Sequence, residues 1–185
     1  YVDNRKLFSH PEAWRDIVET MASRVEEYDL EFDIVAGVEA AGSMHAAALA
    51  YRLGLPAIMV RQKATTYGNH SRIEGGDVKG MRVLLLEDHI STGLSCLDAI
   101  RALRGEGAQV TQVMSITNYA IPETQRLFKQ EGIDTYDVIA FEKVVRKAKE
   151  MGVIDDEHEK LVLEWLQTPW TWAAMHGVVA SAIEN

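Results

Sequence analysis

Residues 83–95 of this 185-residue chain read VLLLEDHISTGLS, an apolar run that ends at an acidic pair and enters a turn with hydroxyl side chains and a glycine. The apolar run, Val83–Leu86, is typical of a strand buried on both faces, as in the middle of a parallel sheet. We therefore expect the acidic pair to emerge at the carboxyl end of a central strand. In open α/β sheets, ligands bind at that edge, where the next helix presents unpaired backbone N–H groups and the positive end of its dipole.

The polar side chains after this strand suit a sugar phosphate. Ser91, Thr92 and Ser95 offer hydroxyl donors for a phosphate. Glu87 and Asp88 would repel a phosphate, so we expect them to accept hydrogen bonds from neighbouring sugar hydroxyls. The alternative is a strand, a turn and a helix cap without a ligand, since Ser and Thr are common cap residues. We favour the ligand, because a cap needs only one hydroxyl.

Strand and helix signals alternate along the chain, which indicates a parallel sheet with helices on both faces. We expect strands at 33–38, 57–60, 82–86, 109–116 and 136–140, and helices at 11–28, 43–53, 95–104, 122–131, 141–151 and 155–166. The first helix should begin at a capping box formed by Ser9 and Glu12, with Pro11 in its first turn. The predicted fold class is α/β, a doubly wound, mainly parallel sheet, in a single domain over residues 1–185.

Composition narrows the range of partners. A net charge of −9 without a basic stripe argues against nucleic acid, whose binding depends on Lys and Arg at the phosphates. No apolar run approaches the ~20 residues that span a bilayer, and no basic-then-apolar leader opens the chain, so we expect a cytoplasmic protein without membrane contact. The single cysteine, Cys96, excludes an internal disulfide and is expected to be a buried packing residue.

Residues 61–80 show neither helical nor strand periodicity, which is unusual within a compact domain. Their place between two predicted strands favours a mobile lid that excludes water, and a plain surface excursion is the alternative. An acidic protein that binds a polyanion needs local positive charge or a divalent cation. The basic residues available in this segment are Arg61, Lys63, Arg72 and Lys79.

The segment VLLLEDHISTGLS resembles the ribose-phosphate signature of the type I phosphoribosyltransferases, which use phosphoribosyl pyrophosphate (PRPP). Residues 37–75 resemble the pyrophosphate loop and mobile catalytic loop of the orotate phosphoribosyltransferases in particular. Residues 1–12, YVDNRKLFSHPE, and 141–155, FEKVVRKAKEMGVID, are also similar to that subfamily. The resemblance implies PRPP and a nucleobase as substrates, Mg²⁺ as cofactor and a homodimer in which each lid reaches the neighbouring site.

The resemblance also implies roles for individual residues. Glu87 and Asp88 would hold the ribose hydroxyls, directly or through water on Mg²⁺, so no residue is expected to bind the metal directly. Ser91 would reach the base. The other substrate-binding positions are Thr92, Gly93, Leu94 and Ser95 at the 5-phosphate, Ala40, Ala41 and Gly42 at the pyrophosphate, Arg61, Lys63, Thr65 and Tyr67 in the lid, and Tyr1 at the base. The catalytic candidates are Arg61, Lys63 and Asp88. A glycine turn that packs a strand on a helix explains residues 37–42 equally well.

The chain departs from the family pattern at four places. Thr65 stands where the lid pattern R-x-K-A-K has its second lysine, a loss that typically costs ~10²–10³ in rate. Leu94 replaces a frequent glycine, and His89 replaces an apolar residue and is expected to be packed or exposed to solvent. The family has a base-contacting lysine before the position of Tyr1, so either this sequence is trimmed or the N-terminal part of the base-binding hood, residues 1–30, is incomplete.

The function implied by the resemblance is transfer of the phosphoribosyl group from PRPP to orotate, which makes orotidine 5′-phosphate for pyrimidine biosynthesis. Such a reaction needs charge stabilisation at the departing pyrophosphate and exclusion of water, but no covalent nucleophile. The alternatives are a non-catalytic PRPP sensor and a phosphoribosyltransferase for a purine-type base. A phosphoacceptor signalling domain would leave the TGLS loop unexplained.

Overall fold

The computed structural model describes residues 2–64 and 71–177 and has a six-stranded sheet with the order β3-β2-β1-β4-β5-β6. The strands are β1 (Ile34–Val38), β2 (Ala57–Val60), β3 (Ile73–Glu74), β4 (Arg82–Ile90), β5 (Gln109–Asn118) and β6 (Asp134–Ala140). Every neighbouring pair is parallel except β2 and β3. The doubly wound, mainly parallel α/β fold is therefore confirmed.

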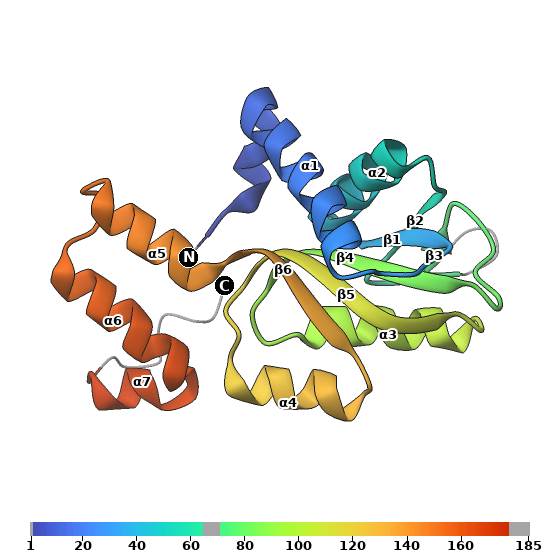
Figure 1. Cartoon of the computed structure of the whole chain (residues 1–185). Helices are drawn as coiled ribbons and strands as arrows, with labels where there is room; N and C mark the ends of the chain where they lie inside the picture. The colour runs from blue at the N-terminus through green and yellow to red at the C-terminus, as the bar shows by residue number, and fades with distance from the viewer. Residues whose placement is uncertain (1, 65–70, 178–185) are drawn as a thin grey trace.

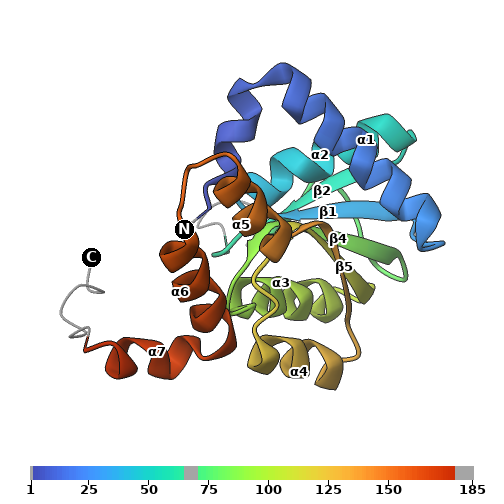
Figure 2. The same ribbon diagram turned by 60° about the vertical axis from the view of Figure 1, so that its left-hand side comes forward.

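Helices cover both faces of this sheet (Figure 1). One face carries α1 (Pro11–Glu27) and α2 (Ala41–Leu53), and the other carries α3 (Leu94–Gly105) and α4 (Pro122–Gln130). A short 3-10 helix, η1 (Asn4–Ser9), precedes α1. The described part of the chain ends in α5 (Phe141–Glu150), α6 (Asp156–Gln167) and α7 (Pro169–Met175), which follow β6 and lie to one side of the sheet (Figures 1 and 2).

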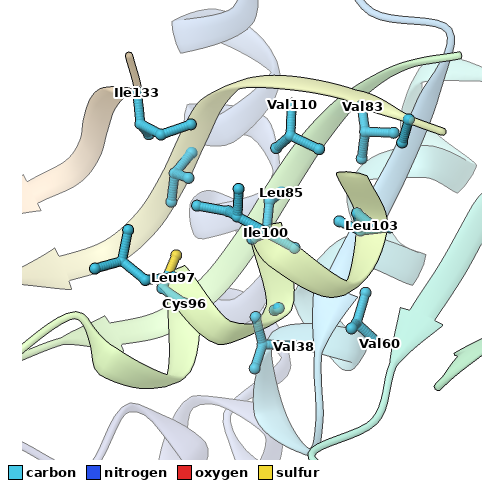
Figure 3. Packing of buried hydrophobic residues seen from close by; sticks show 14 of the residues in the cluster. Val38, Val60, Val83, Leu85, Cys96, Leu97, Ile100, Leu103, Val110 and Ile133 are labelled. Carbon is cyan, nitrogen blue, oxygen red and sulfur yellow. The ribbon is translucent and has the colours of Figure 1, made fainter. Parts of the chain in front are cut away.

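Alternation along β4 assigns its side chains to the two layers. Val83 and Leu85 face α3, where they pack with residues such as Ile100 (Figure 3), and Leu84 and Leu86 face α1 and α2. Because successive strand residues point to opposite faces, the two acidic residues that follow do so as well. Glu87 continues the α3 side and Asp88 continues the α2 side.

Several boundaries differ from the prediction. The strand expected at 82–86 continues to Ile90, since β5 is long enough to pair with it as far as Asn118. The acidic pair therefore lies inside β4, not after it. The elements η1, β3 and α7 were not predicted. The predicted capping box is wrong: His10 occupies the N-cap of α1 without a side-chain bond, and the Ser9 hydroxyl donates to the Lys6 carbonyl (2.8 Å).

The predicted lid over residues 61–80 is too long. Its second half contains the edge strand β3, and Ile73 and Val78 are buried in the core between the sheet and α3. Apolar anchors of this kind hold residues 73–78 against the body of the protein. Residues 65–70, with Thr65 and Tyr67, lie outside the described residues. Within residues 2–64 and 71–177, no helix combines the length and apolar character needed to cross a bilayer.

Candidate active site

The strand order changes direction between β1 and β4, which are parallel neighbours at the centre of the sheet. Connections from β1 proceed toward β2, and connections from β4 proceed toward β5. Crevices at such switch points, outside the carboxyl ends of the strands, are where open α/β sheets bind ligands. A short connection through Ala40 joins β1 to α2, which begins at Ala41, and the loop from Ser91 to Gly93 follows β4. The structure thus brings the two loops predicted to bind phosphates to one crevice.

Two glycines allow α2 to begin directly against the sheet. A Cβ on Gly42 would lie 2.6 Å from the Leu86 carbonyl oxygen, and a Cβ on Gly37 would lie 2.4 Å from the Gly42 carbonyl oxygen. Both contacts are with backbone, which cannot move aside cheaply. The packing explanation for these glycines is therefore correct, and the close approach also places the first turn of α2 beside β4. The Glu39–Ala40 peptide bond in this loop is cis.

The loop after β4 is supported from beneath by α4. Gly93 has a positive φ of 74° and is the N-cap of α3. A Cβ at this position would lie 2.9 Å from side-chain atoms of both Thr124 and Phe128. The Thr124 hydroxyl also donates to the Ser91 carbonyl (3.2 Å). Leu94 and Ser95 are exposed in the first turn of α3, whose backbone N–H groups have no intrahelical acceptors. This arrangement suits an anion.

Glu87 points toward α3 and is partly buried. Burial raises its pKa from 4.5 to about 7, and the neighbouring Asp88 charge adds to the increase. The Asp88 backbone N–H donates to Glu87 Oε1 (3.0 Å) and opposes that increase. The side chain therefore changes charge close to neutral pH.

Asp88 points toward α2 and is held at both its side chain and its backbone. The Nε2 atom of His45, a fully buried residue of α2, lies 3.0 Å from Asp88 Oδ1. The Asn4 side-chain amide donates to the Asp88 carbonyl (3.1 Å) and to the Thr117 hydroxyl (2.8 Å). Neither His45 nor Asn4 was among the predicted site residues. The sequence signal that could have indicated His45 is a polar residue on an otherwise apolar face of a predicted helix.

His89 is a packed side chain, as expected. Its Nδ1 atom lies 2.7 Å from the Thr117 hydroxyl, and its ring centroid is 4.1 Å from that of Tyr119. Burial lowers the pKa of His89, although the Asp88 charge opposes this. Cys96 is also buried, as predicted, and burial raises the pKa of its thiol.

Two of the four basic residues, Arg61 and Arg72, lie near the carboxyl end of β2, whereas Lys79 lies beside Gly107, before β5 begins. Arg61 forms an ion pair with Glu74 on β3 (2.7 Å), and Arg72 pairs with Asp98 on α3 (2.6 Å). A cavity of about 220 Å³ lies between the end of β2 and the first turns of α3. It is lined by Val38, Val60, Arg61, Gln62, Arg72, Ser95, Asp98 and Ala99. Two predicted site residues, Arg61 and Ser95, therefore border one cavity.

The remaining predicted residues are less well placed. Lys63 is exposed, and the structure gives it no position in the crevice. Tyr1, Thr65 and Tyr67 lie outside the described residues. The ranges 2–64 and 71–177 contain no group of three or more His, Cys, Asp or Glu side chains arranged to hold a metal ion. Glu87 and Asp88 are the hard oxygen donors available at the crevice.

Comparison with known proteins explains this arrangement. Residues 3–151 match the family model of the phosphoribosyl transferase domain. An orotate phosphoribosyltransferase of Coxiella burnetii is 41% identical over 93% of this chain and 82% of its own length. The chain belongs to the orotate phosphoribosyltransferase family.

Solved structures agree with that assignment. The Leishmania donovani UMP synthase superposes on 90% of this chain with a TM-score of 0.78 at 25% identity, and the match spans 35% of that longer chain. A Mycobacterium tuberculosis orotate phosphoribosyltransferase in complex with PRPP covers 76% of this chain and 80% of its own, with a TM-score of 0.64 at 28% identity. Type I phosphoribosyltransferases are thus similar to this chain in both sequence and fold.

Proposed function

We propose that this protein transfers the phosphoribosyl group of PRPP to orotate, giving orotidine 5′-phosphate and pyrophosphate in pyrimidine nucleotide biosynthesis. The observation that carries the proposal is the position of residues 87–95. They combine two carboxylates, a hydroxyl-rich loop and a helix N-terminus at the switch point of the sheet, in a chain 41% identical to an orotate phosphoribosyltransferase.

In this proposal the loop after β4 binds the 5-phosphate. Thr92, Gly93, Leu94 and Ser95 supply backbone N–H groups and hydroxyls, and the α3 dipole favours the negative charge. Asp88 accepts hydrogen bonds from the ribose hydroxyls. Glu87, on the opposite face of β4, also holds the ribose hydroxyls, directly or through water on Mg²⁺. Ser91 reaches the base.

Mg²⁺ enters with PRPP in this proposal. Mg²⁺ keeps several of its water ligands when it binds with substrate phosphates, and Glu87 and Asp88 would accept hydrogen bonds from that water without binding the metal directly. The metal would neutralise charge on the pyrophosphate. The protein's own contribution is to hold the ribose and to keep the two carboxylates in place.

The pyrophosphate is expected on the β1 side of the crevice. Ala40 is the N-cap of α2, and the first backbone N–H groups of a helix have no acceptor within it. Arg61 would exchange Glu74 for a pyrophosphate oxygen, and Lys63 would add a second charge. Charge that grows on the leaving group would then meet preorganised donors, which is the largest source of rate enhancement in such reactions. The proposal includes a homodimer, which light scattering checks directly.

The decisive test follows orotate consumption by ultraviolet absorbance with PRPP and Mg²⁺, alongside a calorimetric titration with PRPP. We expect turnover that Asp88→Asn and Glu87→Gln each reduce strongly. Tight PRPP binding without orotate turnover would instead indicate a sensor, or an enzyme for a purine-type base, which adenine and hypoxanthine distinguish. Absence of PRPP binding would refute the proposal.

Thr65 provides a second test of the same reaction. If it occupies the position of the family's second lid lysine, Thr65→Lys adds a cation at the pyrophosphate and should raise kcat by roughly 10²–10³. Thr66→Lys is the matched control, because it adds the same charge one residue away. An equal response of the two variants would mean that Thr65 is not at the catalytic position.

A further inference from the structure

The His45 side chain has an environment that packing alone does not explain. It is fully buried on α2, yet its Nε2 atom lies 3.0 Å from Asp88 Oδ1. A carboxylate only accepts hydrogen bonds, so Nε2 carries the proton and donates it. Hydrogen bonds to a charged acceptor are stronger than neutral ones, and burial strengthens them further.

The imidazole ring is itself fixed by two aromatic side chains. Phe8 of η1 and Trp14 of α1 have ring centroids 5.1 Å and 5.0 Å from that of His45, and 4.9 Å from each other. The three rings thus contact one another in pairs. A ring held in this way can present Nε2 in only one direction, toward Asp88.

The same N-terminal segment also holds the Asp88 backbone. Asn4, at the start of η1, donates to the Asp88 carbonyl oxygen (3.1 Å). Asp88 therefore has a donor on its side chain through His45 and a donor on its backbone through Asn4. Both depend on residues 4–14, which are distant from Asp88 in sequence.

We infer that His45 is a positioning residue that fixes the Asp88 carboxylate for the ribose hydroxyls of PRPP, with Phe8 and Trp14 holding its ring. The inference rests on the proposed function, because it assumes that Asp88 contacts the ribose. Without the His45 donor, the carboxylate would rotate about its side-chain bonds and would be ordered only when PRPP binds. That ordering lowers affinity for PRPP and leaves the orotate site unchanged.

The test compares His45→Phe with His45→Gln. Phenylalanine keeps an aromatic ring between Phe8 and Trp14 but removes the donor, whereas the Gln amide nitrogen lies the same number of bonds from Cα as Nε2. We expect His45→Phe to raise the PRPP Kd, measured by calorimetry with Mg²⁺, and the PRPP KM by about tenfold or more, as for loss of a hydrogen bond to a charged group. The orotate KM should change less than twofold, and His45→Gln should recover most of the loss.

Leu49→Val is the matched control for packing. Leu49 lies on the same helix and is fully buried in the same layer, but its side chain has no hydrogen-bond donor for Asp88. The Leu49→Val substitution should lower Tm and leave the PRPP Kd unchanged. If His45→Phe behaves like Leu49→Val, His45 only packs and the inference is wrong.

A double-mutant cycle adds a direct measure of coupling. In an Asp88→Ala background, which has no acceptor for His45 Nε2, His45→Phe should change the PRPP Kd less than twofold, because its effect passes through the carboxylate. An undiminished effect in that background would overturn the inference. Failure of the proposed function looks different, because the unmodified protein would then bind no PRPP, or would bind it without turning over orotate.

Discussion

Glu87 makes the stability of the protein depend on pH near neutrality. Its pKa is raised from 4.5 to about 7, chiefly by burial. Between these pH values the folded protein holds a proton that the unfolded chain releases, so stability falls as pH rises through this window. The largest possible loss is about 3 kcal/mol at ~1.4 kcal/mol per pKa unit. Glu87→Gln removes this titration. The free energy of unfolding, measured with urea from pH 4.5 to 8, should therefore depend less on pH in Glu87→Gln than in the unmodified protein.

Other buried groups also contribute to the pH dependence of stability. The informative quantity is therefore the difference in free energy of unfolding between the unmodified protein and Glu87→Gln at each pH. Burial also raises the pKa of Asp137, which makes stability fall as pH rises. Burial lowers the pKa of His89, which makes stability fall as pH drops. Both groups are unchanged in Glu87→Gln and cancel in the comparison. Parallel plots of stability against pH for the two proteins would show that folding does not raise the pKa of Glu87.

Gly93 is required by backbone conformation and by space. Its φ is 74°, and a Cβ would lie 2.9 Å from Thr124 and Phe128 side-chain atoms. We expect Gly93→Ala to destabilise the fold by about 1–3 kcal/mol and to weaken PRPP binding, because the phosphate loop must shift. Gly105→Ala is the control: it lies at the end of the same helix with no atom near its Cβ position. That change should be neutral or stabilise by roughly 0.5–1 kcal/mol. Unfolding curves and calorimetry of both variants check this, and equal effects would contradict it.

At the scale of elements, the short helix η1 supports the active site through Asn4. Asn4 is buried and donates to Asp88 and Thr117, so Asn4→Ala leaves a carbonyl and a hydroxyl without that donor. We expect a loss of about 1–3 kcal/mol in the free energy of unfolding. Lys6→Ala, at an exposed position of the same helix, should change stability by less than about 0.5 kcal/mol. Chemical denaturation measures both losses. Similar losses in the two variants would mean that the Asn4 hydrogen bonds make no particular contribution to stability.

Helices and strands with strong periodicity could be predicted, and elements that depend on a partner could not. The ranges of β2 and of the helices after β1 and β4 follow from apolar patterns, and they agree with the structure to within a few residues. The end of β4 depends on β5, whose length offers partners as far as Asn118. The two residues of β3 exist because β2 presents an open edge. Ser9 has the right spacing for a capping box, but its hydroxyl donates to the Lys6 carbonyl instead, because Ser side chains can bond to nearby backbone groups.

For the molecule as a whole, the site could be predicted better than the network that supports it. The acidic pair and the hydroxyl loop are contiguous in sequence, so their proximity needs no knowledge of the fold. The contact of His45 with Asp88 and that of Asn4 with Thr117 join residues 43 and 113 positions apart. Such contacts depend on the order in which α1, α2 and β4 are assembled. The alternation of strands and helices indicates layers but does not give that order.

The whole molecule should be stabilised when PRPP binds, because the site joins both layers of the fold through β4. At a PRPP concentration 100 times its Kd, with Mg²⁺, the stabilisation should be about 2.7 kcal/mol, which corresponds to roughly 5–10 °C in Tm for a chain of this size. Thermal unfolding with and without PRPP measures it. Asp88→Asn should lose most of the shift, whereas Leu49→Val should start from a lower Tm and keep it. A shift that survives in Asp88→Asn would place PRPP elsewhere, since stabilisation by a ligand reports only the contacts that the folded protein makes with it.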